Sequence, residues 1–189
     1  MITIEINGLE LVFETTGALF SPNGIDAGTL AMLSSAEFSR TDKVLDLGSG
    51  YGVVGIYAAK TIGAANVVMS DIDAVCVGLS RRNAEANGVG EIVTVLSDGF
   101  DNIANKDFTL ILSNPPYHAD FNVAKRFIEK GFNRLTIGGK FIMVTKRKEW
   151  YKNKFIAVFG GVTIKETGGY FVFRSEKRGA QYAGAKRGR

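Results

Sequence analysis

The first pattern along the chain is a regular alternation of apolar and polar residues over residues 2–13. Isoleucine and then leucine or phenylalanine occupy every second position, on either side of the dipeptide Asn7-Gly8. Asn-Gly between two alternating runs favours a two-residue β-turn, because both residues tolerate positive φ. The pattern predicts an N-terminal β-hairpin. A polar, glycine-rich connection over residues 15–26 and a helix over residues 27–38 are expected to follow.

From residue 43 onward, apolar runs of strand length alternate with segments of helical period. The predicted strands cover residues 44–47, 67–70, 91–96, 108–112 and 139–145. The predicted helices cover residues 53–61, 73–87, 122–135 and 149–159. Strands that alternate with helices form a parallel sheet whose two faces are both covered by helices. The chain is therefore expected to have an α/β fold.

The C-terminal part breaks this alternation. Two strand-like runs, 162–165 and 170–174, are separated by only four residues, which is too few for a helical crossover. They are expected to pair antiparallel, so that a seven-stranded, mostly parallel sheet ends in a reversed strand. The basic, glycine-rich residues 177–189 lack apolar periodicity and are predicted to be disordered. The predicted units are a hairpin with a connecting segment (1–26), an α/β domain (27–176) and a basic tail (177–189).

The glycine-rich turn after the first parallel strand is the expected ligand-binding site. Gly48, Gly50 and Gly52 stand at every second position, and Asp46 lies within the strand itself. Glycine tolerates positive φ and lets a ligand lie against the backbone. The helix that follows points its N-terminal N–H groups at the same turn. Three glycines in five residues therefore predict a bound ligand.

Two cofactor chemistries fit this site. Gly50, Gly52 and Gly55 match the dinucleotide-binding spacing GxGxxG, and Asp71 lies at the end of the next strand. Asp46 argues against a dinucleotide, because a carboxylate just before the loop repels pyrophosphate and attracts an ammonium group. S-adenosylmethionine carries a sulfonium and an α-amino group and has no phosphate. A redox enzyme remains an alternative only if the chain binds NAD.

The motifs DLGSGYG, SDID, SDG and NPPY each follow a predicted strand. Together they resemble the class I S-adenosylmethionine-dependent methyltransferases. The segment FSPNGIDAGT is similar to the small-domain (MTS) family, and in particular to its ribosomal RNA guanine-N2 methyltransferases. The resemblance covers nearly the whole chain. It implies a Rossmann-like sheet with a reversed C-terminal strand, and S-adenosyl-L-methionine as the cofactor.

Each motif has an expected role toward that cofactor. Asp46 and the backbone of the glycine turn would hold the methionine part, Asp71 the ribose hydroxyls, and Asp98 the adenine amino group. The resemblance makes Phe20 and Asn23 lid residues. The expected cofactor contacts are Phe20, Asp46, Gly48, Ser49, Gly50, Gly52, Asp71, Ile72, Asp98, Gly99 and Asn114. The alternative for each acid alone is a helix cap or a turn residue.

The NPPY motif is expected to carry the reaction. Two consecutive prolines stiffen the turn, and the amide oxygen of Asn114 and the carbonyl of Pro115 form a pair of acceptors for a planar NH₂ group. Pro116 completes the turn and Tyr117 is expected to stack on the substrate. Methyl transfer by proximity and orientation needs no strong base, so His118 is interpreted as a hydrogen-bonding loop residue. The alternative is a structural Asn-Pro turn.

The substrate is less specified than the cofactor. Enzymes with NPPY modify guanine N2, adenine N6 or the side-chain amide of glutamine, because all three offer a planar NH₂ group. The resemblance and the basic C-terminal third favour guanine N2 in ribosomal RNA, with the base unpaired or flipped out. A protein glutamine-amide methyltransferase and a non-catalytic nucleotide- or RNA-binding module on the same fold remain alternatives.

Composition bears on the number of domains and on the presence of disulfides, metal sites and membrane segments. A chain of 189 residues suits one domain, and a single cysteine (Cys76) and a single histidine make disulfides and a metal site improbable. Cys76 is interpreted as a core residue. The sequence shows neither a signal-peptide pattern nor an apolar run of membrane-spanning length, so a cytoplasmic protein without a membrane partner is expected. No oligomeric state is indicated.

Charge is distributed unevenly along the chain. Residues 1–139 hold 10 basic and 16 acidic side chains, whereas residues 140–189 hold 13 basic and 3 acidic ones. Such an excess favours a polyanionic partner such as RNA, although a solvated surface is the alternative. Trp150 and Tyr151 lie among the lysines and the arginine of residues 146–154. Together with Tyr182, they could stack on bases, or they could pack inward.

Overall fold

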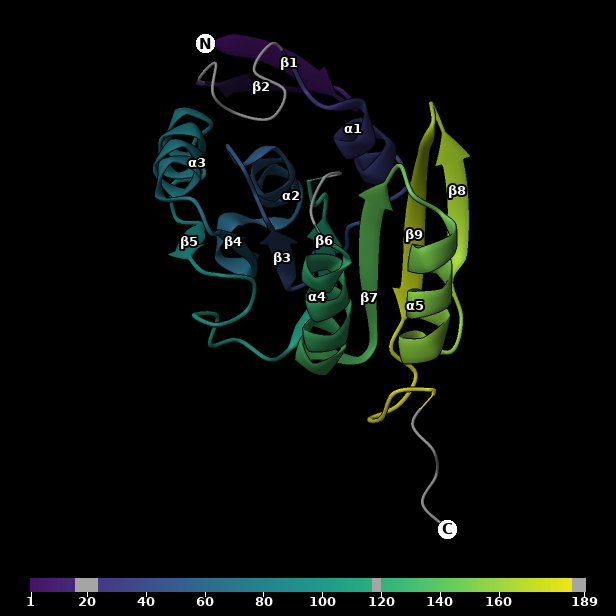
Figure 1. The fold of residues 1–189 in the computed structure, drawn as a ribbon. Coiled ribbons are helices and arrows are strands. Elements are labelled where there is room, and N and C mark those ends of the chain that lie inside the picture. The colour runs from purple at the N-terminus through teal and green to yellow at the C-terminus, as the bar shows by residue number, and fades with distance from the viewer. Residues whose placement is uncertain (16–23, 117–119, 185–189) are drawn as a thin grey trace.

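The sheet has the predicted seven strands. The computed structural model describes residues 1–15, 24–116 and 120–184. Its strand order is β5-β4-β3-β6-β7-β9-β8, and β9 runs antiparallel to both of its neighbours (Figure 1). The strands are β3 (Val44–Leu47), β4 (Val67–Asp71), β5 (Val93–Leu96), β6 (Phe108–Ser113), β7 (Leu135–Thr145), β8 (Thr163–Thr167) and β9 (Tyr170–Glu176). The mostly parallel sheet with a reversed C-terminal strand is thus confirmed.

Helices cover both faces of the sheet. The helices are α1 (Ala27–Leu33), α2 (Val53–Ile62), α3 (Ala74–Ala86), α4 (Phe121–Arg134) and α5 (Glu149–Phe159), with a short 3-10 turn, η1 (Ala64–Asn66). Strand β6 shows how the faces divide: Leu110 and Leu112 join the core under α1 and α2, whereas Ile111 between them joins the core under α4 and α5. Period-two alternation therefore builds two hydrophobic cores.

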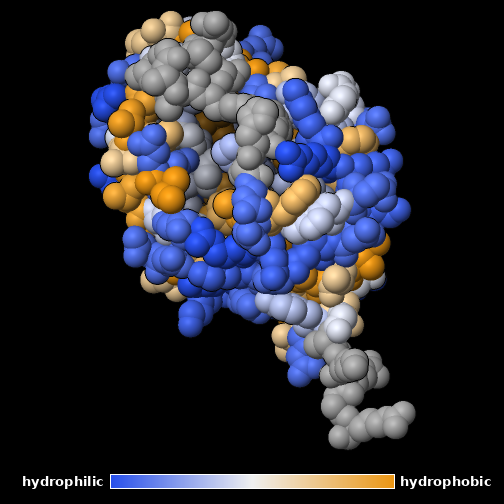
Figure 2. Space-filling view, in the orientation of Figure 1, coloured by the Kyte–Doolittle hydropathy of each residue, from blue (hydrophilic) through white to orange (hydrophobic). Residues whose placement is uncertain are grey.

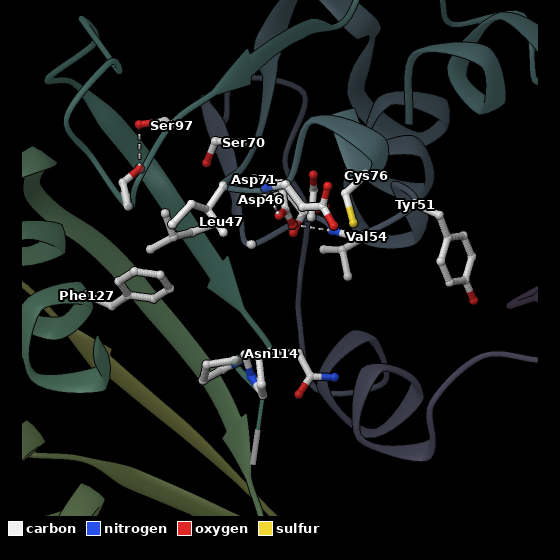
Figure 3. A pocket seen from close by; sticks show the side chains of 18 of the residues that line it. Asp46, Leu47, Tyr51, Val54, Ser70, Asp71, Cys76, Ser97, Asn114 and Phe127 are labelled. Atoms are coloured by element: carbon white, nitrogen blue, oxygen red, sulfur yellow. Dashed lines mark hydrogen bonds between the residues drawn. The ribbon is translucent and has the colours of Figure 1, made fainter. Parts of the chain in front are cut away.

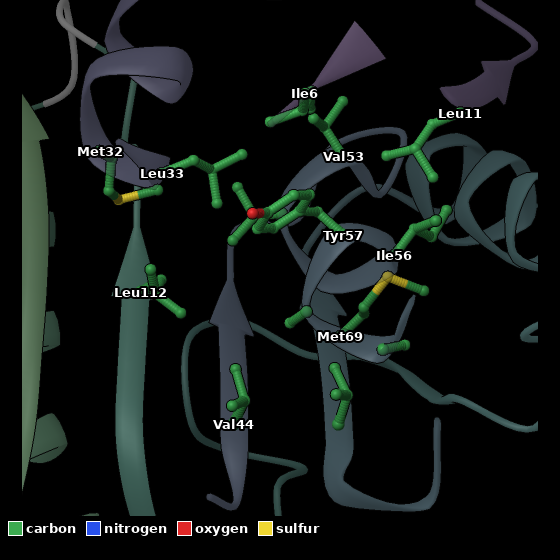
Figure 4. Close-up of a cluster of buried hydrophobic side chains, with 14 of the residues drawn as sticks. Ile6, Leu11, Met32, Leu33, Val44, Val53, Ile56, Tyr57, Met69 and Leu112 are labelled. Carbon is green, nitrogen blue, oxygen red and sulfur yellow. The ribbon is translucent and has the colours of Figure 1, made fainter. Parts of the chain in front are cut away.

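The N-terminal hairpin of β1 (Ile2–Ile6) and β2 (Leu9–Phe13) is confirmed. Asn7 and Gly8 have φ values of 49° and 81°, as the tight turn requires. Figure 4 shows Ile6 and Leu11 of the hairpin above the side chains of α2. The amide of Asn87 accepts from Val12 N at 3.0 Å and donates to Val12 O at 2.7 Å. The side chain of Asn87, which follows α3, thus satisfies both backbone groups of Val12 in β2.

Helix α1 is shorter than predicted. The residue pattern predicts a helix over residues 27–38, but α1 ends at Leu33. The hydroxyls of Ser34 and Ser35 donate to Ala31 O at 2.9 and 3.0 Å. Serine side chains that bind nearby carbonyls compete with continued helical hydrogen bonding, and this ends the helix early.

The C-terminal segment differs from the expectation of disorder over residues 177–189. Residues 177–184 lie against the domain, with Ala183 N donating to Val158 O at 3.1 Å and Gly184 N donating to Ala157 O at 2.9 Å. The Tyr182 ring packs edge-on against Phe132. The Tyr182 side chain and a few backbone hydrogen bonds thus hold a segment whose sequence shows no apolar periodicity. Residues 185–189 lie outside the described part of the chain.

Two helical glycines give a test of the packing. Alanine at Gly131 in α4 would place its Cβ 2.2 Å from Phe141 Cε2, whereas alanine at Gly78 in α3 would meet nothing closer than 3.7 Å. We expect Gly131→Ala to destabilise the fold by about 1–3 kcal/mol through overpacking. Gly78→Ala, the matched control, should stabilise it by about 0.5–1 kcal/mol. Urea unfolding measures both, and equal effects would contradict the tight contact between α4 and β7.

Candidate active site

A cavity of about 490 Å³ opens at the carboxyl ends of β3, β4 and β6 (Figure 3). In the sheet, β3 lies between β4 and β6, so the strand order changes direction at this point. Open α/β sheets bind ligands at such switch points. Most of the predicted site residues line the cavity: Asp46, Gly48, Ser49, Gly50, Asp71, Ile72, Asp98, Gly99, Asn114, Pro115 and Pro116. Phe20, Asn23, Tyr117 and His118 lie outside the described residues.

Most N–H groups of the glycine turn donate hydrogen bonds within the protein. Gly48 N and Ser49 N both donate to Ser70 O, at 2.8 and 2.9 Å. Gly50 N donates to Asp71 Oδ2 at 2.8 Å, and Gly52 N donates to Ser49 O at 2.9 Å. A pyrophosphate site needs such N–H groups for the ligand. These four N–H groups are engaged within the protein, which does not favour a pyrophosphate at this turn.

Four glycines lie in the turn and the first turn of α2. Two of them line the cavity, and the other two allow close packing against neighbouring side chains. Gly48 and Gly50 have positive φ, and a Cβ on either would meet nothing within 4 Å. A Cβ on Gly55 would lie 2.4 Å from Met69 Cγ, and one on Gly52 would lie 3.1 Å from Ser80 Cβ. Gly52, an expected cofactor contact, does not line the cavity. The GxGxxG spacing thus reflects the fit of α2 against its neighbours more than ligand binding.

Asp46 combines a structural and a ligand-binding position. Its Oδ2 accepts from Gly55 N at 2.8 Å, which caps the first turn of α2 in place of a side chain from Gly52, the N-cap residue. The residue is 2% exposed and lines the cavity. The pKa of its carboxyl is raised to about 7, chiefly by burial and to a smaller extent by the nearby Asp71, whereas the hydrogen bond from the Gly55 N–H opposes the shift. Such a carboxylate gains most from a cationic ligand.

Asp71 orders the turn from the next strand. Its Oδ2 accepts from Gly50 N at 2.8 Å and its Oδ1 accepts from Asp73 N at 2.9 Å. An ionised carboxylate has about four acceptor sites, so two remain for ligand hydroxyls. Asp71 therefore acts as a turn residue, and its carboxylate can still accept hydrogen bonds from ribose hydroxyls.

Two buried hydroxyls support a polar ligand in the cavity. The Oγ atoms of Ser49 and Ser70 are buried without a hydrogen-bond partner among the described residues, and both residues line the cavity. Buried polar groups are normally satisfied. With the acidic Asp46 and Asp71 beside them, these hydroxyls form a donor and acceptor set that fits the amino-acid part of S-adenosylmethionine.

The opposite end of the cavity is shaped by Phe127 and an ion pair. Ile72, which was expected beside the adenine ring, is 67% exposed and lines the cavity. Asp98 forms an ion pair with Arg126 of α4, a residue that sequence reasoning missed. Gly99 has a φ of 60°, and a Cβ there would lie 3.2 Å from the Phe127 ring.

Asn114 is held by residues from far along the chain. Its Nδ2 donates to Asp26 Oδ2 and to Thr29 Oγ1, both at 2.9 Å. Tyr170 donates its hydroxyl to Asp26 Oδ1 at 3.1 Å. Because Nδ2 is engaged in this way, Asn114 Oδ1 is the atom left over, and it is buried without a partner among the described residues. The side chain thus presents an acceptor, and Figure 3 shows it across the cavity from Asp46 and Asp71.

Sequence reasoning missed the residues that orient Asn114. Asp26 is the N-cap of α1, where its Oδ2 also accepts from Thr29 N at 3.2 Å. The capping pattern could have identified Asp26 as a helix start but not as a neighbour of Asn114. Cys76, interpreted as a core residue, is buried and also lines the cavity.

In residues 1–15, 24–116 and 120–184, no helix has both the length and the apolar character needed to cross a bilayer. The same ranges contain no cluster of three or more histidine, cysteine, aspartate or glutamate side chains arranged to hold a metal ion.

Comparison with known proteins places this site in a family. The model described as methyltransferase small domain matches residues 10–174. The ribosomal RNA small subunit methyltransferase C of Serratia proteamaculans is 30% identical over 167 residues, which are 86% of this chain and 47% of that protein. The uncharacterized protein YbxB of Bacillus subtilis is 27% identical over 181 residues, which are 93% of this chain and 90% of its own length.

A solved structure agrees with these matches. The Thermus thermophilus 16S rRNA N2 methyltransferase RsmC, in complex with AdoMet and guanosine, has a TM-score of 0.80 at 27% identity. The match covers 94% of this chain and 50% of that one, so the chain spans about half the length of the ribosomal RNA methyltransferases that it matches. Sequence and fold together confirm the resemblance to S-adenosylmethionine-dependent methyltransferases. The chain belongs to the methyltransferase small domain family.

Proposed function

We propose that this protein is an S-adenosylmethionine-dependent N-methyltransferase that modifies an exocyclic amino group of a base in RNA, most specifically guanine N2 of ribosomal RNA. The observation that carries the proposal is Asn114 Oδ1 at the end of β6, which is buried and has no hydrogen-bond partner among the described residues. A planar NH₂ group has N–H bonds to donate and a nitrogen that must face the methyl donor. An acceptor fixed at this place selects that kind of group.

The residues around the glycine turn would hold the cofactor. Bound S-adenosylmethionine supplies a methyl group on a positively charged sulfur. Asp46 would receive the ammonium group, and Asp71 would accept from the ribose hydroxyls. Ile72 and Phe127 would flank the adenine, with Asp98 accepting from its amino group once its pairing with Arg126 is shared. The internal hydrogen bonds of Gly48, Ser49 and Gly50 favour this cofactor over NAD, whose pyrophosphate needs free N–H groups.

Asp26 and Thr29 would prepare Asn114 for the substrate. A carboxylate that accepts from an amide NH₂ strengthens the opposite carbonyl as an acceptor, because hydrogen bonds in a chain polarise one another. The two contacts at 2.9 Å also fix which amide atom faces the cavity. Asn114 Oδ1 would then accept one N–H of the substrate amino group and hold its nitrogen toward the methyl group.

Orientation and electrostatics would account for the rate. The amino nitrogen forms a bond to the methyl carbon as the carbon–sulfur bond breaks, and the nitrogen then loses one proton to water. No strong base is needed, because the methylated nitrogen is acidic enough to release that proton. Holding the two reactants in line removes much of the entropic barrier. Tyr117, outside the described residues, keeps its proposed role as a stacking partner of the base.

The assignment of RNA rests on relatives and charge. The Serratia proteamaculans and Thermus thermophilus relatives are ribosomal RNA methyltransferases by name, although this chain matches about half of each. The 13 basic residues among residues 140–189 favour a polyanionic substrate. A protein glutamine amide offers the same NH₂ geometry and is therefore the second candidate.

A transfer assay tests the proposal. The protein is given methyl-labelled S-adenosylmethionine with unmodified ribosomal RNA, with ribosomal subunits, or with soluble protein, and the Asn114→Ala variant is run in parallel. We expect label in RNA that digests to N2-methylguanosine and is lost in the variant. Label in protein alone would replace the RNA assignment by the amide alternative. Label in neither substrate, despite tight cofactor binding, would contradict an enzymatic role on both.

A further inference from the structure

Three consecutive cations stand where the chain passes from β7 into α5. Lys146, Arg147 and Lys148 are all exposed, and each lies over a different aromatic ring. Lys146 Nζ is 5.0 Å from the centroid of Tyr170, Arg147 Cζ is 4.9 Å from that of Phe121, and Lys148 Nζ is 5.2 Å from that of Phe171. A cation within about 6 Å of a ring face is attracted by it. We call these three cations the cationic ridge.

The rings beneath the ridge come from separate elements. Tyr170 and Phe171 begin β9, and Phe121 begins α4. Phe121 also stacks on Trp150 of α5, with ring centroids 4.6 Å apart and planes inclined at 30°. Trp150 therefore packs inward, as one of the two interpretations of the sequence expected. The result is that the side chains of the ridge are positioned before any ligand arrives, which lowers the entropic cost of binding.

The ridge lies on the rim of the candidate active site. Ser113 of β6 is in register with Met143 of β7, so Asn114 and Pro115 leave their strand beside the residues that lead into the ridge. Neighbouring strands are about 4.8 Å apart. Figure 2 shows hydrophilic side chains gathered over the upper ends of β7 and α5, beside the hollow in this face. A chain that delivers a base to Asn114 would pass this rim.

Two charges of the ridge, those of Arg147 and Lys148, are available to a partner. Lys43, Lys130 and Lys154 form ion pairs with carboxylates of the protein. Among the described residues, neither Arg147 nor Lys148 forms such an ion pair, although Glu149 follows them in the sequence. Arginine presents a planar fork of donors that matches phosphate oxygens, and lysine supplies a point charge. The chemistry of the ridge is that of a phosphate-binding surface.

We propose that the cationic ridge binds the phosphates of the RNA strand that flanks the target base, and so guides that base to Asn114. This inference rests on the proposed RNA substrate and adds the surface through which the strand docks. The RNA is single-stranded where it crosses the ridge, because a base that enters the cavity must be unpaired or flipped out. The rings hold the cations in place while the edges of the guanidinium and the ammonium groups face outward to the phosphates.

Binding of a fluorescent single-stranded oligoribonucleotide tests the ridge. The double variant Arg147→Gln/Lys148→Gln is compared with the wild type by anisotropy from 50 mM to 500 mM salt. Each phosphate contact on a single strand contributes about −0.7 to the slope of log affinity against log salt. Two lost contacts should therefore lower the steepness by about 1.4 and weaken binding about 25-fold at 0.1 M salt.

The matched control is Arg40→Gln/Lys106→Gln. These two exposed residues precede β3 and β6, at the opposite edge of the parallel sheet from the cavity, and their replacement removes the same charge. We expect the control to bind RNA as the wild type does. In methyl transfer, the ridge variant should have a raised KM for RNA, an unchanged kcat and an unchanged affinity for S-adenosylmethionine.

Several outcomes would contradict the proposal that the cationic ridge binds RNA. Equal weakening in the ridge and control variants would mean that only net charge matters. Unchanged RNA affinity in the ridge variant, with the wild type still methylating RNA, would refute the docking surface and leave the proposed function intact. A wild type that binds no RNA would refute the proposed function itself. Equally tight binding of a polyglutamate peptide, lost in the same variant, would make an acidic protein the partner.

Discussion

Replacing Asn114 by alanine is expected to lower kcat for methyl transfer about 10²–10³-fold, a loss typical of removing one preorganised group that acts on the reacting atoms. The variant loses the buried Oδ1 that accepts from the substrate amino group. Its affinity for S-adenosylmethionine should change by less than about fivefold, because Asp46 and Asp71 would hold the cofactor. Single-turnover kinetics and calorimetric titration of the cofactor measure the two quantities separately.

The orientation of Asn114 gives this prediction an internal control. Asp26→Asn keeps the shape of the cap but removes the charge that accepts from Asn114 Nδ2 at 2.9 Å. We expect about a tenfold loss of kcat with an unchanged cofactor affinity, since the Thr29 contact remains. Tyr170→Phe, which removes only the hydrogen bond to the other oxygen of Asp26, should cost less. A full kcat in Asn114→Ala would show that the amide oxygen takes no part in the reaction.

Replacing Asp46 by asparagine is expected to change binding and stability in opposite directions. Affinity for S-adenosylmethionine should fall about 100-fold, because the buried cationic group of the ligand loses its paired charge. The empty protein, in contrast, should become more stable at pH 8. In the wild type at that pH, Asp46 is ionised although it is only 2% exposed, and burial of the charge is unfavourable.

The pH dependence of the wild type follows from the same group. The pKa of Asp46 is raised from its ordinary value of 3.8 to about 7 in the folded protein. Between these two values the folded state binds a proton that the unfolded state has released, so stability falls as pH rises from about 4 to about 7. At about 1.36 kcal/mol per pKa unit, the effect is on the order of a few kcal/mol.

Thermal and urea unfolding at pH 5 and pH 8 check this sign. The wild type should lose stability relative to Asp46→Asn between the two values, in the absence of cofactor. Cofactor affinity of the wild type should rise over the same interval as Asp46 becomes ionised. A stability difference that did not change with pH would mean that Asp46 stays ionised throughout, with its charge already satisfied inside the protein.

Local patterns determined the architecture of this protein. Alternation with period two and period 3.6, the Asn7-Gly8 turn and the short connection before β9 were sufficient to predict the hairpin, the sheet and its reversed strand. The acids and the asparagine at the carboxyl ends of the strands were also visible, because parallel strands bring those ends to one edge. Residues at the strand ends therefore define most of the cavity from sequence alone.

Only the tertiary structure decided what each of those residues does. Whether a turn N–H is free for a ligand depends on Ser70 and Asp71 of the neighbouring strand, 20 or more residues away. The glycines of GxGxxG look alike in sequence, yet Gly55 is required by Met69 and Gly50 faces the cavity. Hydrogen bonding and close packing depend on partners that sequence spacing does not specify.

The contrast is sharpest at Asn114 and at the cationic ridge. The direction of the Asn114 amide is set by Asp26, 88 residues earlier, and through it by Tyr170, 144 residues later than Asp26. The run Lys146 to Lys148 reads as an ordinary basic stretch until rings from α4 and β9 are found beneath it. Sequence thus determined which chemical groups reach this edge of the sheet. Long-range packing, which alone brings such distant side chains together, decided which of their atoms remain for a substrate.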